Sequence, residues 1–342
     1  MPDLTESPPE AAPETRRPRW GTDARGRTPW TRGRVLAAVA ALVGCLIVFH
    51  AVVPNAGWRL GSLLESFLPW LGLAVPALLV LALVRRSATA LLAVLVPVTA
   101  WLVQFGGTAL AAEQTADLTV VQHNVSDENP DPAGTARALA AAAPDLIALE
   151  ELTPEALPAY ADVFAADYPH YAVTGSVGLW SKLPLTDVRP VDIRPAAFPA
   201  TWNRGLRATA VTGQGDVAVY VAHLPSLRFG LSGFGSGPRD ESAAKLGEVI
   251  AAEPLRPLIL LGDLNGTVDD RGLDPILSRT GEPGPGLAFS WPASVPLARV
   301  DQVLAAAATV TGVRTLPATG SDHLPVTAGI RLYPPGATSP VS

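Results

Sequence analysis

Asp263 and Asn265 stand where a run of aliphatic residues ends, in the segment "PLILLGDLNGT" from Pro257 to Thr267. On an extended chain, side chains two residues apart point to the same side. A carboxylate and an amide placed in this way can bind a cation or orient a water molecule, or they can close a turn through Asx hydrogen bonds. The segment is therefore either a turn or one edge of a polar site.

Other isolated polar residues fall where other apolar stretches end. They are Asn124 after one predicted strand, Glu150 and Glu151 after the next, His223 after "VAVYVA", Asp301 in "ARVDQVL", and Asp322 with His323 in "GSDHLPV". Each of them alone is equally well explained as a loop cap or a solvated group. Together with Asp263 and Asn265 they make six such positions in one stretch of chain, which favours a polar pocket at one end of a pair of sheets.

The order of these segments resembles that of the endonuclease/exonuclease/phosphatase superfamily, which has the deoxyribonuclease-I-like fold, over about residues 117–332. The matching motifs are "QHNV", "LIALEEL", "WSKLPL", "VYVAHL", "LLGDLNGT", "RVDQVL" and "GSDHLPV". The resemblance implies a four-layer α/β/β/α sandwich of two mixed β-sheets. The chain is identified as a bacterial member of the family, which the apolar N-terminal third described below would anchor to a membrane. The resemblance also implies a metal-dependent phosphoric ester hydrolase.

The metal site that the resemblance implies is an oxygen site for Mg²⁺ or Mn²⁺. Glu151 would bind the ion with Asn124 nearby, and Asp322 would be a further carboxylate for metal or water. The family has Gln before its metal-binding Glu, whereas this chain has Glu150, which an alternating strand would point away from Glu151. A sparse set of oxygen donors suits Mg²⁺, which keeps several waters and takes the rest from substrate phosphate.

The catalytic roles follow from the same resemblance. Asp263 would orient or deprotonate the attacking water, and Asn265 would hold a phosphoryl oxygen. His323 would contact the phosphate or act as a base, aligned by Asp301, and His223 would stabilise charge on the non-bridging oxygens. Hydrolysis of a phosphate ester needs these groups because an anionic nucleophile must reach an anionic centre. Asp322 belongs to the same catalytic set, while Arg204 and Arg207 are weaker candidates for substrate binding, with a surface role equally open.

The elements that would position these residues alternate between strands and helices from about Ala116 to Tyr333. A helix is expected after Asp131 as N-cap, another after Thr153, and a third over Glu241–Ala252. Strands are expected at 117–125, 145–152, 171–173, 177–181, 206–211, 217–223, 258–261, 299–304, 309–314 and 324–331. This alternation is typical of an α/β domain.

The N-terminal third is far more apolar than this domain. Runs of 18 or 19 residues without Lys, Arg, Asp or Glu cover Val35–Val53, Phe67–Val84 and Ala88–Phe105. About 20 residues are needed to cross a bilayer as a helix, so three transmembrane helices are predicted, with core helices of a soluble domain as the alternative. Seven arginines precede the first run and two follow the second, which predicts a cytoplasmic N-terminus and an extracytoplasmic domain at a plasma membrane.

The predicted organisation is a disordered tail at 1–34, transmembrane helices over 35–105, a linker at 106–116, the catalytic domain at 117–332 and a disordered tail at 333–342. Signal-peptidase cleavage after Ala111 is a further alternative. From Glu113 onward, 15 basic and 25 acidic residues give a net charge near −10, which opposes binding of duplex DNA. A small phosphoester or a lipid head group is the favoured substrate. An extracellular nuclease and a catalytically silent binding module remain alternatives, and no protein partner can be inferred.

Overall fold

The computed structural model describes residues 21–23, 25–110, 115–230 and 233–333. The helices are α1 (Arg34–Val48), α2 (Leu60–Ser66), α3 (Ala74–Val84), α4 (Ala88–Leu110), α5 (Pro132–Ala140), α6 (Leu157–Phe164), α7 (Gly237–Ala252) and α8 (Asp274–Leu277), with 3₁₀ turns at His50–Val52, Leu68–Leu73 and Arg271–Leu273. The predicted cleavage after Ala111, and most of the tails predicted at 1–34 and 333–342, lie outside the described residues.

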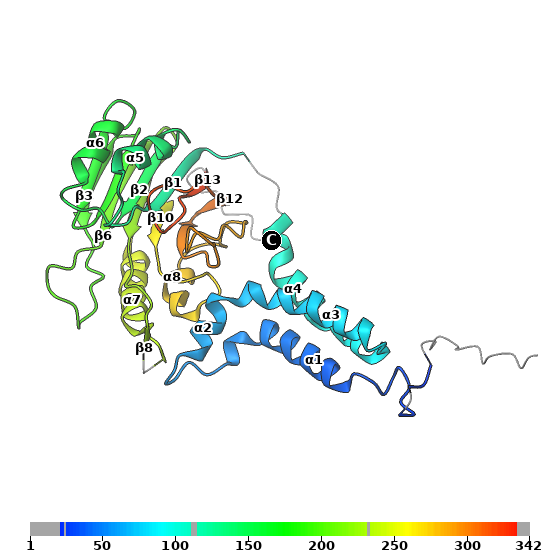
Figure 1. The fold of residues 1–342 in the computed structure, drawn as a ribbon. Coiled ribbons are helices and arrows are strands. Elements are labelled where there is room, and N and C mark those ends of the chain that lie inside the picture. The colour runs from blue at the N-terminus through cyan, green and yellow to red at the C-terminus, as the bar shows by residue number, and fades with distance from the viewer. Residues whose placement is uncertain (1–20, 24, 111–114, 231–232, 334–342) are drawn as a thin grey trace, which may run out of the picture. The chain divides into compact units, whose positions relative to one another are not determined.

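The strands form two large mixed sheets and one small hairpin (Figure 1). The first sheet has the order β12-β13-β1-β2-β4-β3, the second has the order β11-β10-β7-β6-β5, and β8 pairs with β9. Their bounds are β1 (Leu118–Asn124), β2 (Leu146–Glu150), β3 (His170–Thr174), β4 (Val177–Ser181), β5 (Leu185–Pro190), β6 (Gly205–Thr212), β7 (Gly215–Ala222), β8 (Phe229–Gly230), β9 (Gly233–Phe234), β10 (Leu258–Asp263), β11 (Asp301–Ala306), β12 (Ala308–Thr315) and β13 (Val326–Leu332).

Three buried apolar clusters hold the layers together. The largest contains residues of both sheets, such as Val120 and Leu146 from the first and Val219 and Ile259 from the second. A second cluster joins the second sheet to α7 and α8, and a third joins the first sheet to α5 and α6. Each layer therefore buries its apolar side against the next, as the predicted α/β/β/α sandwich requires.

The chain forms two compact units. One comprises the described residues up to Cys45 together with Gly72–Ala100, and the other comprises Leu46–Leu71 together with the described residues from Trp101 onward. In the first unit, α1, α3 and α4 pack through a small cluster around Ala40, Leu78 and Val94. The helices approach closely at Gly44, where an added Cβ would lie 2.7 Å from Cγ1 of Val96.

The prediction of three transmembrane helices is not confirmed. Within the part of the chain that the structure describes, only Ala88–Gly107 is a single helix long and apolar enough to cross a bilayer. The first predicted span folds as a helix of 15 residues, about 22 Å long, which falls short of a hydrocarbon core of about 30 Å. The second begins at a break in the helix, since α2 and the helix over Leu68–Val84 are bent by 70° relative to each other at Phe67. Hydropathy did not register this bend.

The segment Leu46–Leu71 belongs to the same unit as the sandwich and is bound to it by charged side chains. Glu65 in α2 is fully buried and accepts hydrogen bonds from Nε and Nη2 of Arg271 at 2.9 and 2.6 Å. Arg59 donates to Asp240 in α7 at 2.5 Å, and the ring of Trp70 stacks on that of Phe289 at 5.4 Å. The boundary between the two units thus falls inside the stretch that was predicted to form the transmembrane helices.

Most predicted elements of the sandwich are present. Asp131 caps α5 by accepting from the backbone N of Gly134 at 2.8 Å. The edge strand β5 and the hairpin β8–β9 were not predicted. Five of the six residues of β5 are exposed, so this strand has no buried apolar face that its sequence could reveal. Helix α7 begins at Gly237, earlier than Glu241, because Pro238 occupies one of its first two positions, where a missing N–H costs nothing.

Candidate active site

The ends of strands from both sheets bring the predicted polar residues together. In the first sheet Asn124 ends β1 and pairs in register with Glu150, which ends β2. In the second sheet Asp263 ends β10 and pairs with Asp301, which begins the antiparallel strand β11. The two sheets meet where the amide Nδ2 of Asn124 donates to Oδ2 of Asp263 at 3.0 Å.

Asp263 is the centre of this group. Its carboxylate is 1% exposed and also accepts from the backbone N of Asn265 at 2.9 Å. Nε2 of His223 lies 3.6 Å from Oδ2 of Asp263, and Nε2 of His323 lies 3.8 Å from the same atom. Burial raises the pKa of Asp263 to about 7, against the opposing effect of His323. A carboxylate with a pKa near neutrality can accept a proton from water and release it again.

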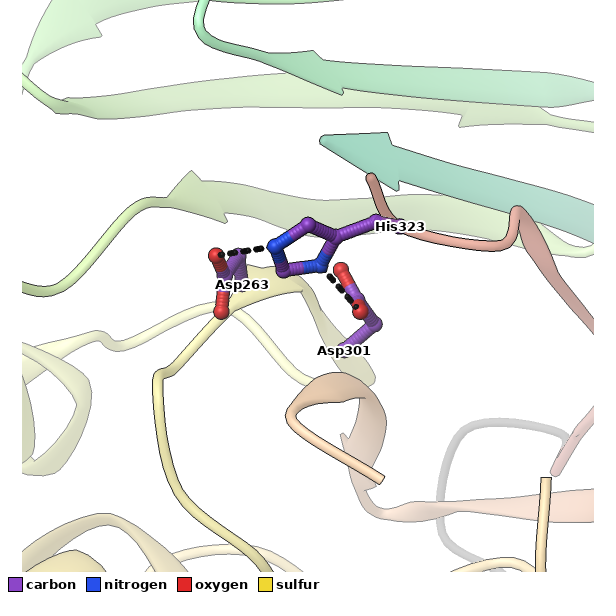
Figure 2. A group of neighbouring side chains, drawn as sticks. All are labelled: Asp263, Asp301 and His323. Carbon is purple, nitrogen blue, oxygen red and sulfur yellow. Dashed lines mark hydrogen bonds and ion pairs between the residues drawn. The ribbon is translucent and has the colours of Figure 1, made fainter. Parts of the chain in front are cut away.

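His323 and Asp301 form a buried pair (Figure 2). Nδ1 of His323 lies 2.8 Å from Oδ2 of Asp301, whose other oxygen accepts from Nε2 of Gln122 at 2.9 Å. Burial disfavours the charged imidazole, but the carboxylates of Asp301 and Asp263 outweigh it and raise the pKa of His323 to about 10. His323 is therefore protonated at neutral pH, with Asp301 fixing the orientation of its ring.

Glu151 and His223 form the other side of the group. Oε1 of Glu151 lies 3.7 Å from Nε2 of His223, and Nη1 of Arg204 lies 2.9 Å from Nδ1 of the same ring. Burial, and then the neighbouring Arg204, hold the pKa of His223 well below its ordinary value. Nη1 of Arg204 also lies 3.2 Å from Nε2, so the guanidinium contacts both ring nitrogens, and Nε2 is the one that faces the two carboxylates.

Glu150 and Glu151 point in different directions. Glu150 is fully buried and accepts from Nε2 of Gln122 at 2.7 Å, and burial raises its pKa well above the ordinary value. The side chain of Glu151 is 24% exposed, and its backbone has a φ of 57°, which is rare for a residue with a Cβ. This turn after β2 directs Glu151 toward His223 while Glu150 stays below the site.

Two sets of donors could hold a cation. One oxygen or nitrogen from each of Asp263, Asp301 and His323 lies within 4.8 Å of the others. In that set, however, the 2.8 Å contact between His323 and Asp301 already occupies one ring nitrogen. The partly exposed carboxylate of Glu151 is the second candidate, since Mg²⁺ prefers carboxylate oxygens and keeps several waters. Asn124 would have to turn its amide to join it, because its oxygen accepts from the backbone N of Ser126 at 3.0 Å while its Nδ2 faces Asp263. With that turn, these residues fit the predicted ion.

The geometry agrees with comparisons to known proteins. A profile described as Endonuclease/Exonuclease/phosphatase family matches residues 121–323, more than half of the chain. The chain belongs to this family. Members of the endonuclease/exonuclease/phosphatase family are metal-dependent phosphoester hydrolases, and the chain is an enzyme of this class. A search of curated protein sequences gives no match.

Solved structures share the fold. A beta toxin from Staphylococcus aureus is 14% identical with a TM-score of 0.53, and the match covers 62% of this chain and 99% of that one. Sphingomyelinase C from Streptomyces griseocarneus is 21% identical with a TM-score of 0.51, covering 63% and 99%. An endonuclease/exonuclease/phosphatase from Beutenbergia cavernae is 22% identical with a TM-score of 0.51, covering 64% and 72%. At these identities the likeness shows the fold alone.

Two of the predicted site residues are not brought into this group. Arg207 is 3% exposed and donates to both carboxylate oxygens of Glu253 at 3.0 and 3.1 Å and to Asp187 at 2.6 Å. These partners occupy its guanidinium, so Arg207 is not part of the group around Asp263. Asp322 is exposed, and its side chain makes no hydrogen bond to another described residue. It raises the pKa of His323 only as the last of several charges.

The structure adds residues that were not predicted. Gln122 bridges the buried carboxyl groups of Glu150 and Asp301. Arg239 in α7 is fully buried and donates to the backbone oxygen of Asn265 at 2.9 Å, which holds the loop after β10. Ser321 donates to the backbone oxygen of Asn124 at 2.7 Å. Gln122 and Ser321 lie inside the family motifs, whereas Arg239 lies in a polar helical segment that resembles any solvated helix face.

Proposed function

We propose that this enzyme is a membrane-anchored, Mg²⁺- or Mn²⁺-dependent phosphoesterase that hydrolyses a small phosphoester or a phospholipid head group at the outer face of the membrane. The single observation that carries the catalytic part is the convergence on Asp263 of Asn124, His223 and His323, from three other segments of the chain. These residues supply a base, a cation and neutral hydrogen-bond donors within one group of neighbouring side chains.

Each of these residues has a distinct role in hydrolysis. Asp263 orients a water molecule and takes up its proton as the oxygen attacks phosphorus. Protonated His323, held by Asp301, and the Nε2–H of His223 stabilise the charge that develops on the phosphoryl oxygens. Asn265 donates from Nδ2 to the backbone oxygen of Leu224 at 2.9 Å, and on substrate binding it would turn this group toward a phosphoryl oxygen.

The bound ion would supply Lewis-acid polarisation of the phosphate and charge neutralisation. Glu151 and Asn124 would hold it, and Arg204 would add a fixed positive charge beside them. The charges of Glu151 and Asp263 act on the Arg204 guanidinium, whose Cζ lies 5.4 Å from the centroid of the Trp202 ring. Its placement supports the weaker prediction that it contacts substrate phosphate.

Apolar surface on α1, α3 and α4 supports the membrane-anchoring part of the proposal. Leu42 in α1, Val80 in α3 and Leu95 in α4 are 58%, 57% and 57% exposed. Exposed apolar side chains on all three helices support contact with lipid or with another protein. The arginines that precede α1 and those between α3 and α4 favour a cytoplasmic side for these ends, and with it an extracytoplasmic catalytic domain. The acidic charge of that domain favours small substrates over duplex DNA.

A substrate panel assayed with the full chain in detergent tests the proposal. Bis-p-nitrophenyl phosphate, phospholipid head-group esters, sugar phosphates and nucleic acids would be compared with Mg²⁺, with Mn²⁺ and with EDTA. Asp263→Asn should lower the rate by about 100-fold or more, because the general base is lost. The matched control is Asp216→Asn, which changes an exposed carboxylate at the end of β7 that lies away from His223. This variant should leave the rate unchanged. Activity on nucleic acid alone would support the nuclease alternative, and inertness on every substrate would support the binding module.

A further inference from the structure

A pocket lies apart from the catalytic residues, within the unit that contains the sandwich. It has a volume of about 310 Å³ and is bordered by the 3₁₀ turn after α2, the end of α4 and the loops that follow β10 and precede β11. Its apolar walls are Pro69, Phe105, Leu287 and Phe289. None of the residues that line it has a catalytic role in the mechanism above, so it needs a separate explanation.

The buried part of this pocket, called its floor below, is the guanidinium of Arg299. Arg299 is 6% exposed, and its Nη1 donates to the backbone oxygens of Gly284 and Gly286 at 3.0 and 3.1 Å. Its Nε and Nη2 atoms are buried and have no hydrogen-bond partner among the described residues. Burial lowers the pKa of Arg299 to about 10, so the group still carries its charge at neutral pH. A buried cation with unmade hydrogen bonds costs stability unless something compensates it.

The two unpaired nitrogens are suited to one kind of ligand. Nε and Nη2 lie on the same edge of the planar guanidinium, and their N–H bonds on that edge run parallel. This edge binds two oxygens of a carboxylate or a phosphate at once. The Nη1 hydrogen bonds to two glycine carbonyls fix the plane of the group, so the fork is held in position before a ligand arrives.

Carboxylates line the same pocket nearer to solvent. Asp269 is partly exposed and accepts from Nε2 of Gln104 at 3.2 Å, and Glu282 is exposed. No oxygen of either residue lies within ion-pair distance of Arg299 in the described structure, although the charge of Asp269 acts on it. The pocket therefore runs from a cationic floor, past apolar and aromatic walls, to an acidic rim. A simple anion would meet repulsion at the rim, while a ligand with a cationic second end would not.

We infer that this pocket binds a small zwitterionic phosphoester, with its phosphate on the Nε and Nη2 edge of Arg299 and its ammonium group beside Asp269 and Glu282. The ligand could be a soluble phosphoester or the head group of a lipid, since both present the same charges. The site is independent of the proposed catalytic reaction, because its residues neither touch Asp263 nor take part in the His323–Asp301 pair.

Titration calorimetry of the full chain in a maltoside detergent with EDTA tests this inference. O-phosphoethanolamine should bind at a single saturable site, more tightly than inorganic phosphate or ethanolamine. Arg299→Lys keeps the charge but loses the fork, and it should weaken binding at least about tenfold, the value of one or two charge-assisted hydrogen bonds. Asp269→Asn should weaken O-phosphoethanolamine binding at least about threefold and leave phosphate binding unchanged.

Controls separate this pocket from the catalytic site and from misfolding. Asp263→Asn should not change the affinity, and loss of binding in that variant would place the ligand in the catalytic pocket and overturn the inference. If Arg299→Lys melts at a lower temperature than the wild type, Leu287→Trp decides instead, because it fills the pocket without removing a hydrogen bond of Arg299. Binding that survives both variants, no saturable binding, or equal affinity for inorganic phosphate would each overturn the inference.

Vesicles distinguish the two sources of the ligand. With the full chain reconstituted, vesicles containing phosphatidylethanolamine should compete with O-phosphoethanolamine if the pocket admits a lipid head group, and phosphatidylglycerol vesicles should not. Competition by neither lipid, with binding of the soluble compound retained, assigns the pocket to a soluble phosphoester. Equal competition by both lipids would contradict the role given to Asp269 and Glu282.

Discussion

Replacing Arg271 by Met should destabilise the unit that contains the sandwich, because it removes the main hydrogen-bond partner of the buried Glu65 carboxylate. Glu65 is 0% exposed and accepts from the backbone N and the Nε and Nη2 atoms of Arg271 at 2.6 to 3.1 Å, and its Oε1 lies 3.0 Å from Nδ1 of His50. Removing one partner of a buried pair costs about 3–5 kcal/mol, and the lower end applies here because the backbone N of residue 271 and Nδ1 of His50 still contact the carboxylate. For a unit of this size, about 3 kcal/mol corresponds to a fall of roughly 6–12 °C in Tm.

The assay is thermal unfolding of the full chain in detergent, followed by tryptophan fluorescence and by loss of hydrolysis. The double variant Glu65→Gln/Arg271→Met should recover at least half of the lost stability, because the uncompensated charge is gone. Arg279→Met, at an exposed position in the same region, is the matched control and should stay within about 0.5 kcal/mol of the wild type. If Arg271→Met melted like Arg279→Met, the segment Leu46–Leu71 would not be part of the unit that contains the sandwich.

Three further predictions concern the site and its support. Asp301→Asn removes the carboxylate that raises the pKa of His323, so the alkaline limit of hydrolysis should move to lower pH in a pH–rate profile, and an unchanged limit would contradict the pairing. Arg204→Met should lower kcat/KM by about tenfold or more with little change in Tm, whereas a Tm loss alone would assign it a structural role. The Glu253 carboxylate is opposed by burial, but Arg207 and Tyr220 lower its pKa to about 2, so about 3 kcal/mol of stability, present above pH 4.5, should be lost as the pH falls toward 2. Equilibrium unfolding of Glu253→Gln should show a correspondingly weaker acid dependence between those pH values than the wild type.

The positions of the site residues were predictable because apolar strands end abruptly at them. Asp263 and Asn124 each follow a run of buried residues, and a strand that ends in a polar group places it at the edge of its sheet. Alternation also predicted that Glu150 and Glu151 point apart, although in the structure a turn at Glu151, with φ 57°, separates them after the strand has ended. Local pattern was sufficient there because the information lies within a few residues.

Pairings between distant residues were not predictable. Glu65 and Arg271 are 206 positions apart, and nothing near either residue indicates the other. Arg207 resembled Arg204 in sequence, yet it lies on a buried strand and pairs with Glu253, which is 46 positions away. The bend at Phe67 was missed for a related reason, since average hydropathy measures composition and is insensitive to helix direction. Tertiary contacts decide the pairings of Glu65 and of Arg207.

The position of a bound manganese ion tests the central claim most directly. Anomalous diffraction from crystals of the full chain soaked in Mn²⁺ should show an ion coordinated by the carboxylate of Glu151 at roughly 2.0–2.2 Å, with Asn124 and Asp263 facing it. The same soak of Glu151→Gln should show the ion lost or much weaker, with hydrolysis lost in parallel. An ion held between Asp301 and His323 instead, or no ion near Glu151, would contradict the proposed mechanism.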